Sequence, residues 1–201
     1  MKNPSRFIKT VVAVAASLAF VVAFMPSVAL ATGDPITKAG NLELYTKLIN
    51  AYPTLLPDTG SITPTELGTI SGSLECLKGD TNLTSIEGLQ YCSQVTEMNF
   101  TNDTNLTTLP SDMSGLQSLY QLQLYNCPKI GNSSVAAIAT LPEFKTLDPN
   151  PAHAGYLSIY MTGITDLSAL ATANLAGLTQ LQWGGNSNLT LAKPKSTGGN
   201  P

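Results

Sequence analysis

The sequence is poor in the side chains on which most catalytic and metal sites depend. It has one histidine, His153, and three cysteines in 201 residues. No C-x-x-C pair, G-x-S-x-G motif or H-E-x-x-H motif occurs. Carboxylates such as Glu87, Glu97 and Asp112 could be brought together by folding, but nothing in the sequence singles them out. We therefore expect no enzyme, no cofactor and no metal site, and we interpret the odd set of cysteines as free thiols.

Acidic side chains are absent from the first 31 residues, which instead begin with Lys2, Arg6 and Lys9. An apolar run follows from Thr10 to Met25, and then a small-x-small site ends at Ala31. A basic start, an apolar stretch and such a site are the three parts of a secretory signal peptide. The run is shorter than the roughly 20 residues of a membrane-spanning helix. We expect residues 1–31 to be cleaved, leaving a secreted or surface-exposed protein with no membrane insertion.

Basic residues are also scarce after the signal. Three of the ten lysines and arginines, and none of the thirteen aspartates and glutamates, precede residue 32, so the remaining chain has seven basic residues against thirteen acidic ones and a net charge of −6. Binding to nucleic acid needs a clustered basic face. The composition therefore argues against nucleic acid as a partner, and against simple electrostatic adhesion to anionic lipid.

What the sequence does contain is an internal repeat. Residues 78–86 align with residues 101–109 at a spacing of 23. The leucine-rich-repeat template L-x-x-L-x-L-x-x-N/C-x-L then fits four later segments. No single repeat can cover its own apolar side, so neighbouring repeats must stack into one core. The third apolar position of the template falls at Phe100, Leu124, Ile159 and Trp183.

The repeats are unevenly spaced. The interval from Leu124 to Ile159 is 35 residues instead of 24, and we place its additional residues in the proline-rich stretch 148–155. A first, less regular copy lies around Leu74, Cys76 and Leu83, where one residue must be inserted to keep the register. In this register Cys76 and Cys127 are expected to point into the core.

Residues 32–72 have a different pattern. Asp34-Pro35 can start a helix whose apolar residues recur at helical spacing from Leu44 to Tyr52. Thr63-Pro-Thr-Glu66 has the spacing of a capping box and predicts a second helix to about Ile70. The sequence therefore predicts a short α/β repeat solenoid of four to five rungs with a parallel concave sheet. Its parts are a helical N-terminal cap at 32–72, leucine-rich repeats at 73–191, and a flexible tail or linker at 192–201.

The repeats resemble those of a known family. Ile86-Glu-Gly-Leu-Gln-Tyr91, followed by an L-x-x-L-x-L strand, looks like the first repeats of internalin-like bacterial leucine-rich-repeat surface proteins. Residues 164–170 are similar to their I-x-D-L-x-x-L turn. The resemblance covers roughly residues 32–191 and implies a right-handed solenoid outside the cell whose concave sheet binds proteins. This chain departs from the family in its longer, fewer repeats and in having no LPxTG motif after Leu191.

The candidate site lies at strand positions that do not carry the apolar residues of the template. These positions are expected to face the concave side, with Tyr125 and Tyr160 as neighbours on adjacent rungs. Tyrosine is common at interfaces because it buries a large rigid surface and keeps a hydrogen bond. The alternative is that these are ordinary sheet residues that stabilise their cross-strand neighbours. The candidate binding residues are Tyr120, Gln121, Gln123, Tyr125, Tyr156 and Tyr160.

Two functions therefore remain open. The first is a monomeric binding module for another protein, or for a cell-surface glycan. The second is a structural spacer or envelope component with no specific ligand. The turns 79–82 and 102–105 could be interpreted as calcium loops, but each offers one aspartate where calcium needs six to eight oxygens, so we expect no metal there.

Overall fold

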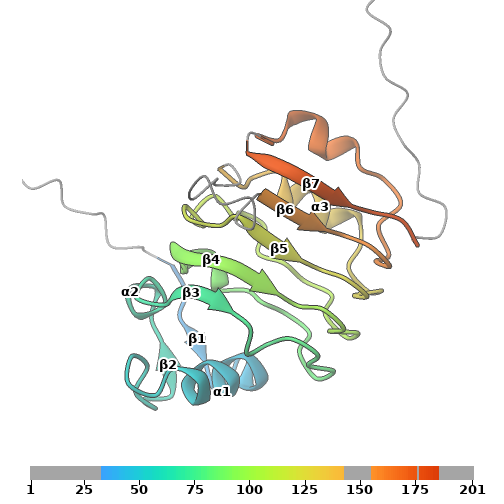
Figure 1. Ribbon diagram of the computed structural model, residues 1–201. Helices are drawn as coiled ribbons and strands as arrows, with labels where there is room; N and C mark the ends of the chain where they lie inside the picture. Colours follow the sequence, from blue (N-terminus) through green and yellow to red (C-terminus); the bar gives the residue numbers. More distant parts are fainter. Residues whose placement is uncertain (1–32, 143–154, 176, 186–201) are drawn as a thin grey trace, which may run out of the picture.

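A five-stranded parallel β-sheet is the central feature of the computed structural model, which describes residues 33–142, 155–175 and 177–185 (Figure 1). The strands lie side by side in chain order, so every connection leaves one end of a strand and returns to the start of the next. This arrangement fits the α/β leucine-rich-repeat fold that the spacing predicted. The strands are β3 (Ser71–Leu74), β4 (Gln94–Asn99), β5 (Gln121–Gln123), β6 (Gly155–Ser158) and β7 (Leu178–Gln182).

The strand pairing reproduces the register of the sequence repeat. Met98 pairs with Leu122, Leu122 with Leu157, and Leu157 with Leu181. The ladder continues beyond the strand ends, since the Asn102 N–H donates to the Tyr125 carbonyl at 2.9 Å. Each repeat is thus hydrogen-bonded to the next through both its strand and the turn that follows.

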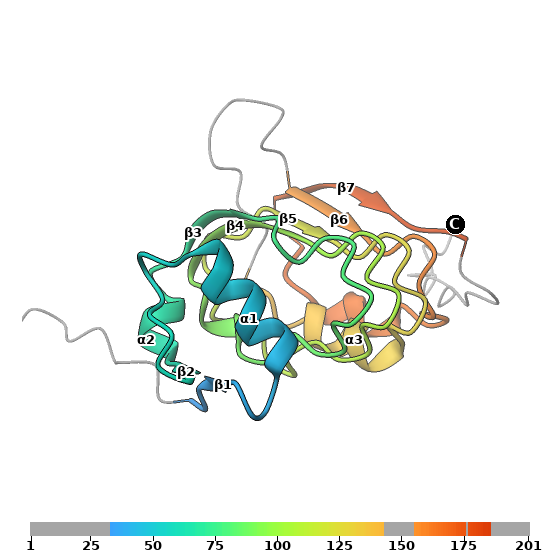
Figure 2. The ribbon, with the colours of Figure 1, turned by 90° about the horizontal axis from the view of Figure 1, so that it is seen from below.

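The core lies on one side of this sheet. Figure 2 shows the strands as one layer and the returning segments, with α3 (Asn132–Ile138), as the other. Alternate strand residues point between the two layers, and those that the template marks as apolar are almost completely buried. The predicted core residues Phe100, Leu124 and Ile159 each expose at most 1% of their surface.

The last repeat departs from this rule. Leu181 and Trp183 occupy the same template positions, yet 38% and 46% of their surface is exposed. The prediction that they are core residues is wrong for the described chain. The physical reason is that β7 has β6 on one side and no described strand on the other.

The first repeat contains the predicted extra residue. Leu74 pairs with Met98, whereas the Gly79 N–H bonds to Thr101 O in the way that Asn102 bonds one repeat later, so the first repeat is one residue longer. The insertion shifts the core position from Cys76 to Leu77, which is fully buried. Cys76 is therefore only half-buried, contrary to expectation, while Cys127 is buried as predicted and Cys92 is buried too. All three are free thiols.

The residues before the sheet are partly helical. Helix α1 (Leu42–Ala51) begins after Asn41, whose side-chain oxygen accepts from the Leu44 N–H at 3.2 Å. The predicted start at Asp34-Pro35 is wrong, because the next residues form strand β1 (Ile36–Thr37) antiparallel to β2 (Ser61–Ile62). The capping box predicted at Thr63 and Glu66 is present, but α2 (Pro64–Leu67) is shorter than expected. Both helices lie next to β3, at the first edge of the sheet (Figure 1).

The long interval between β5 and β6 contains a helix that the sequence analysis missed. Helix α3 places Val135 and Ile138 in the core, three residues apart as one helical face requires. The predicted insertion at 148–155 lies mostly outside the described residues, and its last residue, Gly155, begins β6. The described part of the returning layer also holds two short 3₁₀ segments, η1 (Leu89–Tyr91) and η3 (Ser168–Thr172). Among the described helices, none has the length and apolar character needed to cross a membrane.

Candidate binding surface

The face of the sheet opposite the core, which we call the open face, carries rows of polar and aromatic residues. Gln121 pairs with Tyr156, and Gln123 pairs with Ser158 on the same face. The predicted site residues Gln121, Gln123 and Tyr156 therefore lie where the repeat register places them, and all three are half-buried. The first row is Glu97, Gln121, Tyr156 and Gln180, and the second is Asn99, Gln123, Ser158 and Gln182.

A stacked pair of tyrosines follows these rows. The rings of Tyr125 and Tyr160 lie with their centroids 5.4 Å apart and their planes 9° from parallel. Both side chains are half-buried. A β-carbon at Gly184 or Gly185 would approach the Tyr160 ring to 3.4 or 3.3 Å, so the absence of side chains there leaves room for the ring. The predicted contact between these two tyrosines across adjacent repeats is present.

Tyr120 adds little exposed area to this surface. It is 5% exposed, and its hydroxyl donates to the Glu97 carboxylate. The expectation of four tyrosine rings on one exposed face is therefore wrong for Tyr120. Because Glu97 lies on the open face, the Tyr120 hydroxyl reaches that side of the sheet, but the Tyr120 side chain is covered there instead of exposed.

The polar groups of the open face bind one another. The Tyr156 hydroxyl donates to Gln182 Oε1 at 2.5 Å, and the Ser158 hydroxyl donates to the same oxygen at 2.9 Å. On the same face, near the β3 edge of the sheet, Asn99 Nδ2 donates to both carboxylate oxygens of Glu75, at 3.2 and 3.1 Å. These contacts hold the side chains of the open face in fixed positions.

The charge of the open face changes from one side to the other. Glu75, just after β3, and Glu97 in β4 bring carboxylates to the side nearest the helices. Strands β5, β6 and β7 contain no charged residue. The face therefore has an acidic end and an uncharged aromatic end.

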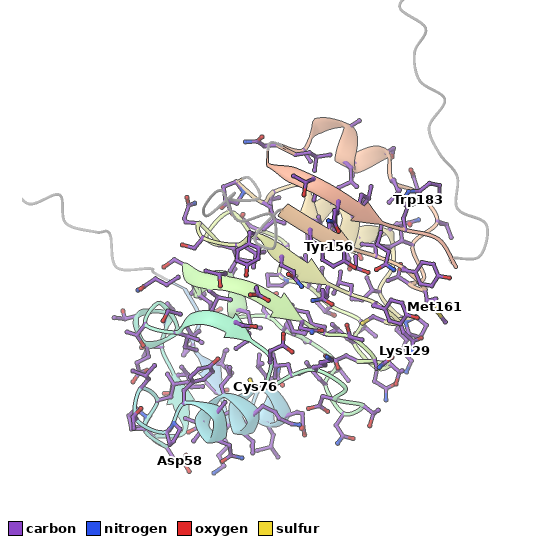
Figure 3. All side chains as sticks on the ribbon, in the orientation of Figure 1. Asp58, Cys76, Lys129, Tyr156, Met161 and Trp183 are labelled. Carbon is purple, nitrogen blue, oxygen red and sulfur yellow. The ribbon has the colours of Figure 1, made fainter. Side chains whose placement is uncertain are left out.

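A cleft of about 380 Å³ lies beside the aromatic end, between Asn126, Pro128, Met161, Gly163 and Gly185. Figure 3 shows Met161 and Trp183 projecting at this end of the molecule, and Tyr156 over the sheet. Met161 is 39% exposed, and its φ of 55° lies in the left-handed region. The same turn in neighbouring repeats uses Asn126, with φ of 55°, and Gly185, with φ of 63°. Asparagine and glycine tolerate this conformation and methionine does not, so Met161 is the strained member of the series.

Replacing Met161 tests this strain. We expect Met161→Gly to be more stable than Met161→Ala by about 1 kcal/mol, because glycine reaches the left-handed region without the steric cost of a β-carbon. In ordinary backbone conformations a glycine variant is less stable than the alanine variant, so a more stable glycine variant would itself indicate the left-handed conformation. Thermal unfolding followed by circular dichroism measures it, and alanine matching or exceeding glycine would show that Met161 is unstrained.

Two buried aspartates lie in the turns considered as calcium loops. Asp103 is fully buried, its Oδ1 accepts the Asp80 N–H at 2.7 Å, and its Oδ2 has no hydrogen-bond partner among the described residues. Burial raises the pKa of Asp103 to about 7. The inward direction expected for Asp103 is confirmed.

Both carboxylate oxygens of Asp80 have a partner, unlike those of Asp103. Its Oδ1 accepts the Asn82 N–H at 2.8 Å, and its Oδ2 lies 3.1 Å from Lys47 Nζ. Burial opposes ionisation of Asp80, but the Asn82 N–H and Lys47 outweigh it and hold its pKa below the usual value. A hydrogen bond with Asp80 raises the pKa of Glu43. Both aspartates thus accept hydrogen bonds from backbone N–H groups of the turns. In the described part of the chain no three His, Cys, Asp or Glu side chains are grouped to hold a metal ion.

Two of the three carboxylates considered for catalysis share a cleft, and the third lies apart from them. Glu87 and Asp112 line one shallow cleft of about 460 Å³ with Gln90 and Ser114. Glu97 lies on the open face instead. The Ser114 hydrogen bonds lower the pKa of the exposed Asp112, so this carboxyl is ionised at neutral pH and unsuited to act as a general acid.

Comparison with known proteins gives structural similarities only. Neither a protein-family model nor a curated protein sequence matches this chain. The structure of internalin C2 from Listeria monocytogenes is similar, with 23% identity, a TM-score of 0.34, and coverage of 81% of this chain and 82% of that one. Another internalin of the same species, InlF, has 19% identity, a TM-score of 0.30, and coverage of 70% of this chain and 48% of that one.

Proposed function

We propose that this protein is an exported leucine-rich-repeat protein that binds another protein through the open face of its sheet. In this proposal the stacked repeats form a short solenoid, the open face is its concave side, and residues 32–72 are its N-terminal cap. Two contacts support the cap: Asn41 Nδ2 donates to Ser85 O at 2.9 Å, and Lys47 pairs with Asp80. They tie the helical segment to the first repeat.

The observation that carries the binding role is the Tyr125–Tyr160 pair. Stacking fixes both rings, yet each keeps part of its surface in solvent. A rigid, partly exposed aromatic side chain can bury a large area on binding at little entropy cost, which is why tyrosine is frequent among residues that dominate interfaces. The glutamine and tyrosine side chains of β5 to β7 supply hydrogen-bonding groups around it.

The charge of the open face indicates the chemistry of the partner. An uncharged, partly apolar part of the partner would lie on the tyrosines, and a cationic group would lie near Glu75 and Glu97. Complementary charge speeds association and fixes orientation more than it adds affinity. We expect the association rate to fall as salt is raised, because the carboxylate at Glu75 is exposed.

A spacer without a ligand is the second candidate. The mutual hydrogen bonds of Tyr156, Ser158 and Gln182 favour it, because they satisfy these groups within the sheet. Stacked aromatics also stabilise neighbouring strands by about 0.5–1.5 kcal/mol without any partner. We propose no enzymatic activity for either candidate.

The binding role is tested by affinity capture with residues 32–201 as bait. The variant Tyr125→Ala/Tyr160→Ala removes the stacked pair, and Leu42→Ala removes an exposed hydrophobic side chain of α1, outside strands β3 to β7. Tyr120 stays unchanged because it is buried. A partner identified by mass spectrometry is then titrated against all three proteins, and we expect the tyrosine variant to bind at least about tenfold more weakly while Leu42→Ala binds normally.

Circular dichroism must show that all three proteins are folded. A partner bound equally by the tyrosine variant would exclude the open-face site. Capture of no protein would favour the spacer, and a glycan retained on a glycan array by the native chain alone would change the class of partner.

A further inference from the structure

One methionine of the chain after the signal is exposed, and the others are not. Residues 32–201 contain Met98, Met113 and Met161. Met98 and Met113 expose at most 1% of their surface, whereas Met161 is 39% exposed and projects from the aromatic end of the molecule (Figure 3). Oxidation of a methionine requires that the oxidant reach its sulfur, so Met161 is the methionine open to this chemistry.

The three cysteines are protected from the same oxidants. Cys92 and Cys127 are buried, and Cys76 is half-buried. The thiolate is the reactive form of a cysteine. Burial raises the pKa of Cys76 to about 11 and the pKa of both other thiols to about 12. At neutral pH all three cysteines therefore stay protonated, and they react slowly with peroxides.

The backbone at Met161 indicates a role for its side chain outside the core. Its φ of 55° is left-handed, a conformation that Asn126 and Gly185 tolerate in the equivalent turns and a methionine does not. The side chain does not offset this strain by packing inside the protein, because much of it is in solvent. Residues strained in this way are concentrated at functional sites.

Met161 also lines the cleft beside the stacked tyrosines. A β-carbon at Gly185 would lie 2.7 Å from Met161 Cγ, so the methionine side chain lies against that glycine. Asn126 and Pro128, on the same cleft, carry no charge. Tyr160 of the stacked pair directly precedes Met161 in the chain. A change in the polarity of the thioether therefore changes the surface next to the tyrosines.

We propose that Met161 is a site of oxidative modification, at which a peroxide converts the thioether to a sulfoxide. The sulfur lone pair attacks one peroxide oxygen, so that an S–O bond forms as the O–O bond breaks. Sulfur loses two electrons, the peroxide gains them, and hydrogen peroxide leaves as water. The product is a polar side chain in place of an apolar one.

The sulfoxide is expected to change the surface and leave the fold intact. Met161 lies outside the core, so the added oxygen displaces no buried packing. It would place a hydrogen-bond acceptor in the cleft, where an apolar group of a partner would lose its contact with the thioether. Oxidation would then weaken binding at the aromatic end of the open face. This last consequence rests on the proposed function, whereas the modification itself does not.

Treatment of residues 32–201 with hydrogen peroxide, followed by peptide mass spectrometry, tests the site. We expect Met161 to gain one oxygen atom at least about tenfold faster than Met98 or Met113. In urea that unfolds the chain the three rates should become similar, because burial is the source of the selectivity. The urea midpoint of the oxidised protein should match that of the untreated protein. Met161→Leu is the control, since it keeps an apolar side chain without the sulfur.

Equal rates at Met161 and at a buried methionine in the folded protein would overturn the proposal, as would oxidation of Cys76 ahead of Met161. The effect on binding is measured with the partner captured as above. We expect the oxidised native protein to bind it more weakly, and peroxide-treated Met161→Leu to bind it as the untreated variant does. Equal binding by the oxidised and untreated native proteins would leave the modification site standing and exclude its effect on binding. Capture of no partner would count against the proposed function alone.

Discussion

Leu124→Asp is expected to leave the protein unfolded at 25 °C. Leu124 is fully buried between the strands and the returning segments. A carboxylate there would lose its hydration with no cation to pair with, which costs several kcal/mol, or it would take up a proton at a similar cost. The lost leucine packing adds about 2–5 kcal/mol. The total approaches the whole stability of a typical domain, about 5–15 kcal/mol.

The neighbouring residue supplies the control. Gln123 lies on the open face, half-buried, and its backbone carbonyl accepts from the Phe100 N–H whatever its side chain is. Gln123→Asp should therefore change the free energy of unfolding by no more than about 0.5 kcal/mol. Far-UV circular dichroism and urea unfolding measure both variants. A folded Leu124→Asp with an unchanged transition would mean that the repeat register is wrong.

The repeat register could be predicted because it rests on a period shared by several segments. Each fit to a leucine-rich template is weak alone, but the segments around Phe100, Leu124 and Ile159 share the same internal pattern of apolar residues, and the strand pairs follow it. Burial at these positions is imposed by stacking, since every inner repeat has a neighbour on both sides. The same reasoning fails at Leu181 and Trp183, because the template describes the residues within one repeat. It does not show which described repeat has no neighbour on one side.

Elements without a repeat were predicted less well. In the described part of the chain the other returning segments hold no α-helix, and the seven residues of α3 carry too little periodicity to be separated from a loop. The start of α1 was misplaced because Asp34-Pro35 and Asn41 are both acceptable starts, and the pairing of β1 with β2, which is not local, decides between them. The capping box at Thr63 was predicted correctly because it is local: all its hydrogen bonds join residues 63 and 66.

The candidate site was predicted in part for the same reason. Alternation and register place Gln121, Gln123 and Tyr156 on the open face, and they bring Tyr125 to Tyr160. They do not reveal that the polar groups bind one another. Met161 was missed as well, because its left-handed φ shows only when it is aligned with Asn126 and Gly185 in equivalent turns. Such an alignment is a usable signal for strained positions in repeats.

The free energy of unfolding is expected to rise as the pH is lowered from 8 to 5, and Asp103 is the reason. Burial raises the pKa of Asp103 to about 7 from its ordinary value of 3.8. Nearby Asp80 adds repulsion, while the backbone N–H of Asp80, the Gly79 N–H and Lys47 oppose the shift. Most carboxylates in proteins have the opposite dependence, because their ionised form is the one stabilised by folding.

The sign follows from the protons bound in each state. Between pH 3.8 and about 7 the unfolded chain has lost the Asp103 proton while the folded chain keeps it, so raising the pH favours unfolding. Each pH unit in this window costs about 1.4 kcal/mol, on the order of 4 kcal/mol in all. Above pH 7 the cost no longer grows. Asp80 acts in a separate pH window, because its pKa is lower in the folded chain than in the unfolded chain. Its ionised form therefore stabilises the fold at pH values above the pKa of the unfolded chain, and this stabilisation is lost only in stronger acid.

Asp103→Asn should remove this dependence and stabilise the protein at pH 8. The amide has no charge to desolvate, and its oxygen can still accept the Asp80 N–H. Asparagine is also the residue that the repeat template prefers here, with Asn186 in the same template position of the last repeat. Urea unfolding at pH 5 and pH 8 measures the effect, with Asp112→Asn as the control because that exposed carboxyl has a lowered pKa and stays ionised throughout. A native protein equally stable at both pH values would show that Asp103 folds ionised, with a bonding partner for its Oδ2.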